Sequence, residues 1–567
     1  MKLNYLLLSA LSVFTLLETA TAQTTIEKTV PLSKKASKGY FYDARQNPET
    51  GNIEVVYKFK NNSSDEKGAY ETYYFDKDLT PLKQEESSVL KSDIADKPDY
   101  KRTYVYATVG GCTSFNILSN KLHLTRLSFD YTWNTDKKGY VRKRTDDTEI
   151  KPANDEKRAY SGYISFANSE TGNLMVLAAS ETKGEKGKLQ KDFVLLDVKT
   201  DLSTTEIPLL SESSQLVYSG ILQNPSDESG ELSVSESEGD ISKADMFFIF
   251  APSFNKNSTA DYKKYTYIRA DKNGKIKANI KFDSPSPNLI ITGLVQNADG
   301  SFYLCGSYNN LDKTFDQLYQ EYSPLPNPCY TEGLNHRMTV YENKTEKLEM
   351  NYFSLFKFKD DKVEWSKSTP IEQFEKVLKK PASQKKTVAY KGNRLKIQTI
   401  GKMSNGDLII TGQLLGKVMI DKLYHKSYKD VVCFQLSPVG EIKAQYGIKT
   451  ESSSDDLNTI YEMDQSVIPS ADGKYCYLSI LETNVSKGYA NYFDAVNGVK
   501  TYYADYSPSV AKINLSTNTI EQYSLLGEGK YKLKKKKPCL YNEKEKAMYY
   551  FGSDGSKNVW VAKYPMQ

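Results

Sequence analysis

The sequence has few of the residue types on which catalytic and metal sites usually depend. Its 567 residues include three histidines, three tryptophans and six cysteines. It has no Gly-x-Ser-x-Gly nucleophile elbow, phosphate-binding loop, His-Glu-x-x-His helix or dinucleotide fingerprint. These absences exclude the enzyme classes that those motifs define. We expect no catalytic residue, no cofactor and no metal, and lean towards a non-enzymatic protein, with catalysis as such left open.

The three histidines have different expected surroundings. His123 alternates with Leu122 and Leu124, a pattern typical of a structural residue on a strand. His336 and His425 fall in segments that we expect to be loops, where carboxylates could complete a metal site with them. A loop position without a metal is the simpler interpretation for both.

The cysteines are spread along the chain without a Cys-x-x-Cys pair, so they have neither zinc-binding nor redox spacing. Several lie inside apolar runs, which predicts buried, unpaired thiols that act as small hydrophobic side chains. Up to three disulfides after export stay open as the alternative. The six are Cys112, Cys305, Cys329, Cys433, Cys476 and Cys539.

Long apolar runs are also rare. The clearest, Leu6 to Leu17, follows a basic Met1-Lys2 start and precedes Ala20-Thr21-Ala22, so residues 1–22 read as an export signal. No later run is long enough for a transmembrane anchor. With 76 basic and 71 acidic residues the net charge is only +5, which argues against nucleic-acid binding. We expect one exported domain over residues 23–567, periplasmic or extracellular, and soluble or peripherally associated with the outer membrane.

A polar turn followed by a strand recurs through the chain. The clearest copies are Glu49-Thr50-Gly51-Asn52-Ile53 and Glu170-Thr171-Gly172-Asn173-Leu174. Gly, Asn and Asp suit hairpin turns with positive φ. A short apolar strand precedes each turn and a hairpin follows most of them, so each unit holds about four strands. The eight turns are marked by Gly51, Lys121, Gly172, Gly230, Gly300, Gly406, Gly473 and Lys546.

Four-stranded units repeated in this way resemble β-propeller repeat proteins, across essentially the whole of residues 23–567. The resemblance concerns the general architecture, because the chain has no Trp-Asp repeat and only one Gly-Gly pair, Gly110-Gly111. It implies an all-β propeller of eight blades, with seven as the alternative. The last unit ends after its third strand near Lys557–Lys563, so we expect Thr24–Leu32 to supply the fourth strand and close the ring.

One short helix is expected near residues 370–380. Thr369-Pro370-Ile371-Glu372 has the form of a capping box with proline at the first helical position. Ile371, Phe374, Val377 and Leu378 would then share one face. We expect this helix to pack on the rim of the propeller, with partner binding as the alternative.

Three insertions are predicted between second and third strands, at about 309–350, 416–429 and 483–507, and all would emerge on one face of the ring. They are rich in tyrosine, which is typical of recognition loops on a rigid scaffold. Packing of the insertions onto the blades is the alternative role. The candidate partner-binding residues are Tyr330, Tyr424, Tyr489, Tyr492, Phe493, Tyr502 and Tyr503.

The strongest charge feature is Lys530 to Lys537, with six lysines in eight residues. We hypothesise that Lys534, Lys535, Lys536 and Lys537 contact an anionic surface, such as lipid head groups, an acidic glycan or an acidic partner. A solvated loop is the alternative.

These observations favour a binding or scaffold propeller of a Gram-negative cell envelope, holding a protein partner on its loop-rich face. It would be a soluble subunit of an outer-membrane-associated complex for protein export or nutrient uptake. The alternative is a secreted protein that binds or degrades glycans with carboxylates near the central channel. The scarcity of tryptophan argues mildly against that alternative, because sugar-binding platforms favour tryptophan.

Overall fold

A computed structural model gives the arrangement of most of the mature region. The residues it describes are 25–47, 49–60, 67–90, 100–109, 122–134, 139–150, 158–183, 189–210, 214–223, 240–256, 259, 261–297, 299–318, 349–393, 395–420, 423–470, 472–488, 501–533, 539–542, 545–554 and 557–566. The predicted export signal lies outside them.

The described chain is almost entirely β, and its strands form eight sheets. In the first half these are β2 (Tyr40–Gln46), β3 (Ile53–Lys58), β4 (Lys67–Phe75) and β5 (Pro81–Leu90); β6 (Tyr100–Val109), β7 (Leu122–Asn134) and β8 (Gly139–Ile150); β9 (Arg158–Ala167), β10 (Leu174–Lys183), β11 (Leu189–Val198) and β12 (Thr204–Leu210); and β13 (Ser214–Gln223), β14 (Ala244–Pro252), β15 (Lys264–Ala270) and β16 (Ile276–Asp283).

The second half continues the same pattern. Its sheets are β17 (Ile290–Gln296), β18 (Phe302–Tyr308), β19 (Tyr352–Lys359) and β20 (Lys362–Pro370); β22 (Leu395–Lys402), β23 (Leu408–Ile420), β24 (Leu423–Leu436) and β25 (Ile442–Ile448), with β21 (Leu378–Lys379) as a fifth strand; β26 (Asp464–Pro469), β27 (Tyr475–Gly488), β28 (Thr501–Asn514) and β29 (Thr519–Leu525); and β30 (Cys539–Asn542), β31 (Ala547–Ser553) and β32 (Asn558–Pro565), with β1 (Ile26–Pro31).

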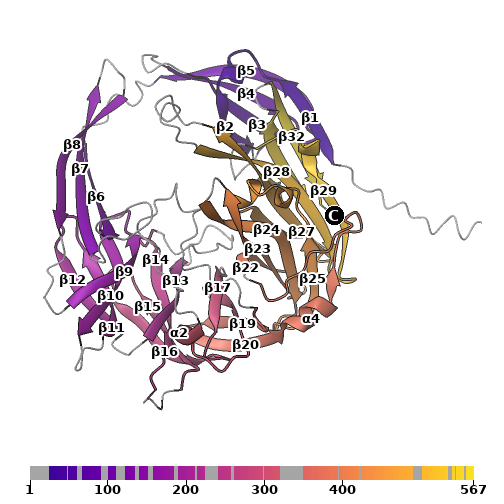
Figure 1. The fold of residues 1–567 in the computed structure, drawn as a ribbon. Helices are drawn as coiled ribbons and strands as arrows, with labels where there is room; N and C mark the ends of the chain where they lie inside the picture. The colour runs from indigo at the N-terminus through magenta and orange to yellow at the C-terminus, as the bar shows by residue number, and fades with distance from the viewer. Residues whose placement is uncertain are drawn as a thin grey trace, which may run out of the picture.

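Apart from β21, which pairs parallel with β25, paired strands are antiparallel within each sheet, and neighbouring sheets pack face to face in an arc (Figure 1). Middle strands are therefore buried on both faces. In β14, all eight residues from Ala244 to Ala251 are buried, whereas the outer strand β16 largely alternates between half-buried and exposed residues. Hydrophobic clusters join most neighbouring sheets, for example Phe302 and Phe358 with Tyr267 across one junction.

The repeated turn has the same geometry in its two clearest copies. Gly51 and Gly172 have φ of 72° and 74°, a conformation that favours glycine. The side chains of Asn47 and Asn168 each accept hydrogen bonds from the two backbone N–H groups that lie two and three residues further on. The repeated motif therefore specifies the turn that connects the first and second strands of a sheet.

The N-terminal strand β1 completes the last sheet, as the sequence predicted. It pairs antiparallel with β32 from Ile26 opposite Lys563 to Pro31 opposite Asn558. The carboxylate of Glu27 accepts hydrogen bonds from the indole of the fully buried Trp560 (3.0 Å) and from the backbone of Gly527 (3.1 Å). The two ends of the described chain thus share one sheet.

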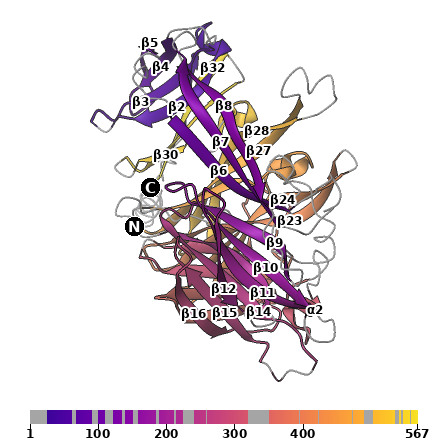
Figure 2. The ribbon, with the colours of Figure 1, turned by 90° about the vertical axis from the view of Figure 1, so that its left-hand side faces the viewer.

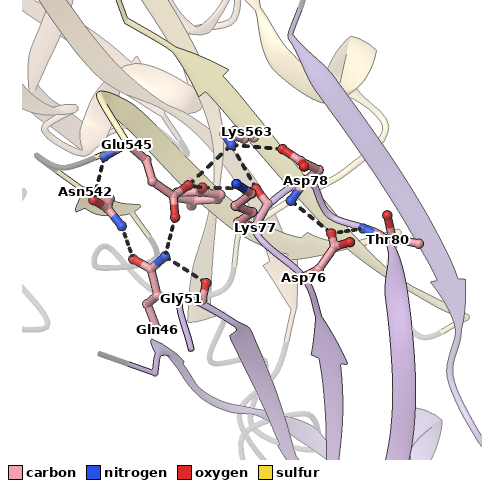
Figure 3. Close-up of polar contacts among 10 residues, drawn as sticks. Gln46, Gly51, Asp76, Lys77, Asp78, Thr80, Asn542, Glu545 and Lys563 are labelled. Carbon is pink, nitrogen blue, oxygen red and sulfur yellow. Dashed lines mark hydrogen bonds and ion pairs between the residues drawn. The ribbon is translucent and has the colours of Figure 1, made fainter. Parts of the chain in front are cut away.

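A polar network joins this last sheet to the first one (Figure 3). Lys563 Nζ donates to the Lys77 carbonyl at 2.8 Å and lies 3.4 Å from Asp78 and 3.3 Å from Glu545. Close by, Asn542 donates to the Gln46 side chain at 2.7 Å, and Gln46 donates to Glu545 at 3.3 Å. Beneath this network, apolar residues of both sheets form one cluster.

The second sheet differs from the other seven because the structure describes three strands in it, in the order β6-β7-β8. Val105 and Leu124 pack against the following sheet. Among the side chains that the structure describes, no hydrophobic cluster joins β6–β8 to β2–β5, and these two sheets form the separated ends of the arc in Figure 1.

The predicted helix is present as α4 (Ile371–Lys376), with Ile371 and Phe374 buried. Two details of the prediction were wrong. Thr369 does not cap the helix, because it belongs to β20 and pairs with Phe353, and the N-cap is Pro370 without a side-chain hydrogen bond. The helix also ends early, because Leu378 and Lys379 form β21 beside β25.

The remaining described helical segments are short: α2 (Phe315–Leu318) and the 3-10 turns η1 (Ala36–Lys38), η5 (Ser452–Ser454), η6 (Asn458–Ile460) and η7 (Leu526–Gly529). None of the described helices is long and apolar enough to cross a membrane.

Three of the six cysteines have described side chains. Cys305, Cys433 and Cys476 are buried and unpaired, which confirms the prediction for these three. Burial raises the pKa of the Cys476 thiol to about 12 and that of Cys305 further still, so both stay protonated at neutral pH.

Candidate partner-binding face

The topology places equivalent connections on one face of the arc. Because neighbouring strands are antiparallel, the connection between the second and third strands leaves the edge of a sheet opposite to the short turn after the first strand. A short connection from one sheet to the next, such as that from Asp283 to Ile290, keeps this strand direction in the following sheet. We call the face that carries the connections between second and third strands the insertion face.

Two of the predicted insertions are strands rather than loops in their described parts. β23 and β24 pair as a ribbon up to Ile420 opposite Leu423, and β27 and β28 pair up to Gly488 opposite Thr501. Both ribbons run beyond the sheets to which they belong and extend towards the same side in Figure 2. The expectation of loops at 416–429 and 483–507 was therefore wrong for the described residues of both ranges.

The connection between the two ribbon-bearing sheets, residues 449–463, holds the ribbons together. Ser427 of β24 donates to the Thr459 hydroxyl at 2.9 Å. On the other side, the Asn458 side chain accepts the backbone N–H of Val485 in β27 at 2.7 Å. A single segment is thus hydrogen-bonded to both ribbons, which favours one rigid unit over two independent loops.

A buried carboxylate anchors this segment. Glu482, 1% exposed, accepts hydrogen bonds from the backbone N–H groups of Glu451 (2.6 Å) and Ser452 (3.1 Å) and from the hydroxyls of Ser509 (3.1 Å) and Tyr523 (2.5 Å). Burial raises the pKa of Glu482, and these donors oppose the rise. The arrangement ties β27, β28 and β29 to the segment and has a structural role.

A second group of connections fixed by hydrogen bonds lies on the two preceding sheets, β13–β16 and β17–β20. The side chain of Asn288, 0% exposed, donates to the carbonyls of Leu311 (2.9 Å) and Lys313 (3.1 Å), which fixes the start of the insertion after β18. The backbone N–H of Phe254, in the connection after β14, donates to Asp316 of α2 at 2.8 Å. The connections of these two sheets therefore contact each other.

Exposed apolar side chains follow the insertion face over four consecutive sheets. Phe254 and Leu311 are each 46% exposed, Met419 is 56% exposed and Tyr503 is 43% exposed. They lie on the connections, or on the ribbon strands, between the second and third strands of their sheets. We call these four side chains the apolar row.

The structure describes only part of the predicted binding set. Tyr502 and Tyr503 are neighbours on β28; Tyr502 is half-buried below Lys487, and Tyr503 is exposed beside Gly488. Tyr424 lies on β24, next to Met419 in the register. Outside the described residues are Tyr330, Tyr489, Tyr492, Phe493, Lys534, Lys535, Lys536 and Lys537.

Sequence reasoning selected insertions by their length and, within them, chose candidate residues mainly because they were tyrosines, so it missed Phe254, Leu311 and Met419. For Phe254 and Leu311 the available signal was position, since both are apolar residues in connections between strands, whereas Met419 lies on β23. Glu482 gave no such signal, because its four partners come from three separate stretches of the chain.

The histidine and carboxylate positions do not assemble into a metal site among the described residues. His425, expected in a loop, is a buried residue of β24. Burial would raise the pKa of Glu462, but Lys396, the Gln398 amide and the Tyr428 hydroxyl stabilise its charged form and lower it. Glu462 thus stays ionised, which does not suit a general acid.

Comparisons with known proteins identify no family. No protein-family model matches the chain, and no curated protein matches its sequence. Among solved structures, a puromycin hydrolase aligns at 10% identity over 92% of this chain and 60% of its own, with a TM-score of 0.24. An apocarotenoid oxygenase from Synechocystis aligns at 10% identity over 82% and 94%, with a TM-score of 0.29. A member of the DUF4221 family from Bacteroides vulgatus aligns at 12% identity over 72% and 94%, with a TM-score of 0.21.

The chain therefore spans about 60% of the length of the puromycin hydrolase that it matches. All three TM-scores are low.

Proposed function

We propose that the chain is a non-enzymatic scaffold of the bacterial cell envelope, built as an eight-bladed β-propeller, that binds a protein partner on its insertion face. In this proposal the eight sheets are the blades, and β1 closes the last of them. Residues 1–22 direct export, and the mature chain acts as a soluble subunit of an outer-membrane-associated complex.

The observation that supports the proposal most strongly is that the side chains of the apolar row lie on segments fixed by hydrogen bonds. Methionine and aromatic side chains are enriched at the centres of protein interfaces. Here Met419 and Tyr503 stand on two ribbons that are hydrogen-bonded to one segment, and Phe254 and Leu311 stand on connections held by Asp316 and Asn288. Preorganised supports of this kind reduce the entropy lost on binding.

The glycan-degrading alternative has no comparable support. The two carboxylates described above are held in structural roles, Glu482 by four donors and Glu462 by cationic and amide neighbours. Glycoside hydrolysis instead uses a pair of carboxyl groups that flank the scissile bond.

Site-specific photo-crosslinking in the native envelope tests the proposal. A photoreactive phenylalanine analogue at position 419 or 503 should capture a protein partner. The matched control is position 439, because Val439 is 59% exposed in the turn between β24 and β25, at the opposite edge of the same sheet as Met419. Equal capture from position 439, or no capture from 419 and 503, would contradict the assignment.

A substitution experiment then separates two binding surfaces. Met419→Ser with Tyr503→Ser should lose the captured partner while Val439→Ser retains it, with β circular dichroism unchanged in both. If the first variant retains the partner and reversal of Lys534 to Lys537 to glutamate loses it, the lysine-rich segment is the binding surface instead.

A further inference from the structure

The outer edge of the second sheet is one strand short of the pattern of its neighbours. In every other sheet a fourth strand lies beyond the third, and in the last sheet that strand comes from the far end of the chain. Among the described strands, β8 pairs with β7 alone. An edge of this kind offers a row of backbone N–H and C=O groups to another strand.

The charges of β8 are divided along its length. Arg142, Lys143 and Arg144 occupy its first half, and Asp146, Asp147 and Glu149 its second. Arg142 and Lys143 are exposed. Charged residues on a sheet edge usually oppose pairing with another copy, because like charges then meet. Here their order has the opposite effect, because an antiparallel copy brings the basic half against the acidic half.

The pairing register between β8 and β7 shows which basic residue of β8 would lie opposite which acidic residue of a second copy. A bulge at Thr145 shifts the pairing between the two halves, since Arg144 lies opposite Phe129 and Asp146 opposite Ser128. As a result four charged positions of β8 fall opposite odd-numbered positions of β7, and so share one face of the sheet. These positions are Arg142, Arg144, Asp147 and Glu149, opposite Tyr131, Phe129, Leu127 and Thr125.

We propose that β8 pairs antiparallel with β8 of a second copy of this chain about a two-fold axis beside Thr145. Arg142 then lies opposite Glu149 of the second copy, and Arg144 opposite Asp147. The same register places Val141, which is 40% exposed, opposite Ile150. Each pair occurs twice because a two-fold interface uses the same patch on both chains, and the two sheets join into one of six strands.

The test uses two full-length mature variants with opposite charge. R142E/R144E makes the four matched positions of β8 acidic and D147R/E149R makes them basic. Each variant should therefore be monomeric where the parent chain is dimeric by light scattering on a sizing column. An equimolar mixture of the two should restore the dimer, as a heterodimer shown by a tag on one variant. K83E, on the outer strand β5 of the first sheet, should leave the dimer unchanged.

Circular dichroism of each variant shows whether it is folded, and the rescue by mixing excludes misfolding as the cause of a monomer. The proposal is overturned by a monomeric parent chain, by dimers that persist in both variants, or by folded variants that fail to combine. A monomeric parent whose β8 edge binds an extended peptide of a different protein would also overturn it, in favour of a heterologous partner.

Discussion

The contribution of the β1–β32 pairing to stability can be tested by removing a single hydrogen bond. Glu27 accepts the indole N–H of Trp560 at 3.0 Å, and Trp560 is fully buried and stacked on Tyr531 with ring centroids 5.5 Å apart. Glu27→Ala removes the carboxylate and leaves a buried indole N–H without its acceptor. It also removes the acceptor of the Gly527 N–H.

The expected loss follows from these two contacts. A hydrogen bond to a charged group contributes roughly 1.5–3 kcal/mol, and a stranded buried donor costs about 1–3 kcal/mol. Because Glu27 is itself exposed, we expect the lower part of this range, about 2 kcal/mol for Glu27→Ala. Glu27→Gln keeps a carbonyl acceptor and should cost about half as much.

A double-mutant cycle with Trp560→Phe isolates the pair. Urea unfolding of the mature chain, followed by far-ultraviolet circular dichroism, should give a coupling energy of about 1–2 kcal/mol between Glu27→Ala and Trp560→Phe. Lys28→Ala, on the same strand, is the control for general loosening of β1. A coupling below about 0.3 kcal/mol, or a Glu27→Ala loss no larger than that of Lys28→Ala, would show that this bond does not hold β1 in the sheet.

Three further predictions concern other parts of the fold. Lys563→Met should lower the unfolding free energy by about 1–2 kcal/mol, because the ammonium group bridges the first and last sheets from a side chain that is 13% exposed; an unchanged urea midpoint would show that the network in Figure 3 is dispensable. Cys305, Cys433 and Cys476 should be unreactive towards a thiol reagent in the native chain and react in denaturant without reductant, whereas a thiol that appears only after reduction would reveal a disulfide. The folded-state pKa of Glu482 is raised, so its contribution to stability should fall as pH rises above the unfolded value near 4.5; Glu482→Gln should abolish that slope, and a slope equal to that of the parent would refute the assignment.

The repeated turn and the shared last sheet could be predicted from sequence because each depends on local chemistry. Gly51 and Gly172 mark turns that require positive φ, and the alternation of polar and apolar residues places strands on either side. The pairing of β1 with β32 followed from counting strands in the last unit. In both cases the residues on which the prediction was based are the residues that form the turn or the strand pair.

The β23–β24 ribbon and the start of α4 are features that local sequence patterns did not predict. The sequence between Ile420 and Leu423 is Asp421-Lys422, which contains no glycine or asparagine to predict a tight hairpin. Thr369 has the right spacing for a capping box, but its position in β20 is fixed by pairing with Phe353, which a single-sequence pattern does not contain. Long-range pairing decided both outcomes.

The sequence predicted where the insertion face lies but only some of the residues that are exposed on it. Tyr503 was expected and is exposed there, whereas Met419, Phe254 and Leu311 were not. Their exposure depends on how far each connection projects from its sheet, and that depends on hydrogen bonds such as those of Asn288 to carbonyls more than twenty residues away.

The two proposed interfaces constrain each other through strand direction. The insertion face lies at the edge of each sheet from which the third strand begins, and β8 is a third strand. Antiparallel pairing of β8 with its copy reverses that direction, so the two insertion faces of a dimer would point opposite ways. A dimer of this form could not bind two partners embedded in one membrane surface, although it could bridge two soluble ones. If photo-crosslinking at Tyr503 captures an integral outer-membrane protein while the R142E/R144E variant binds it more strongly than the parent does, the dimer and the membrane-bound complex are alternative states of the same chain.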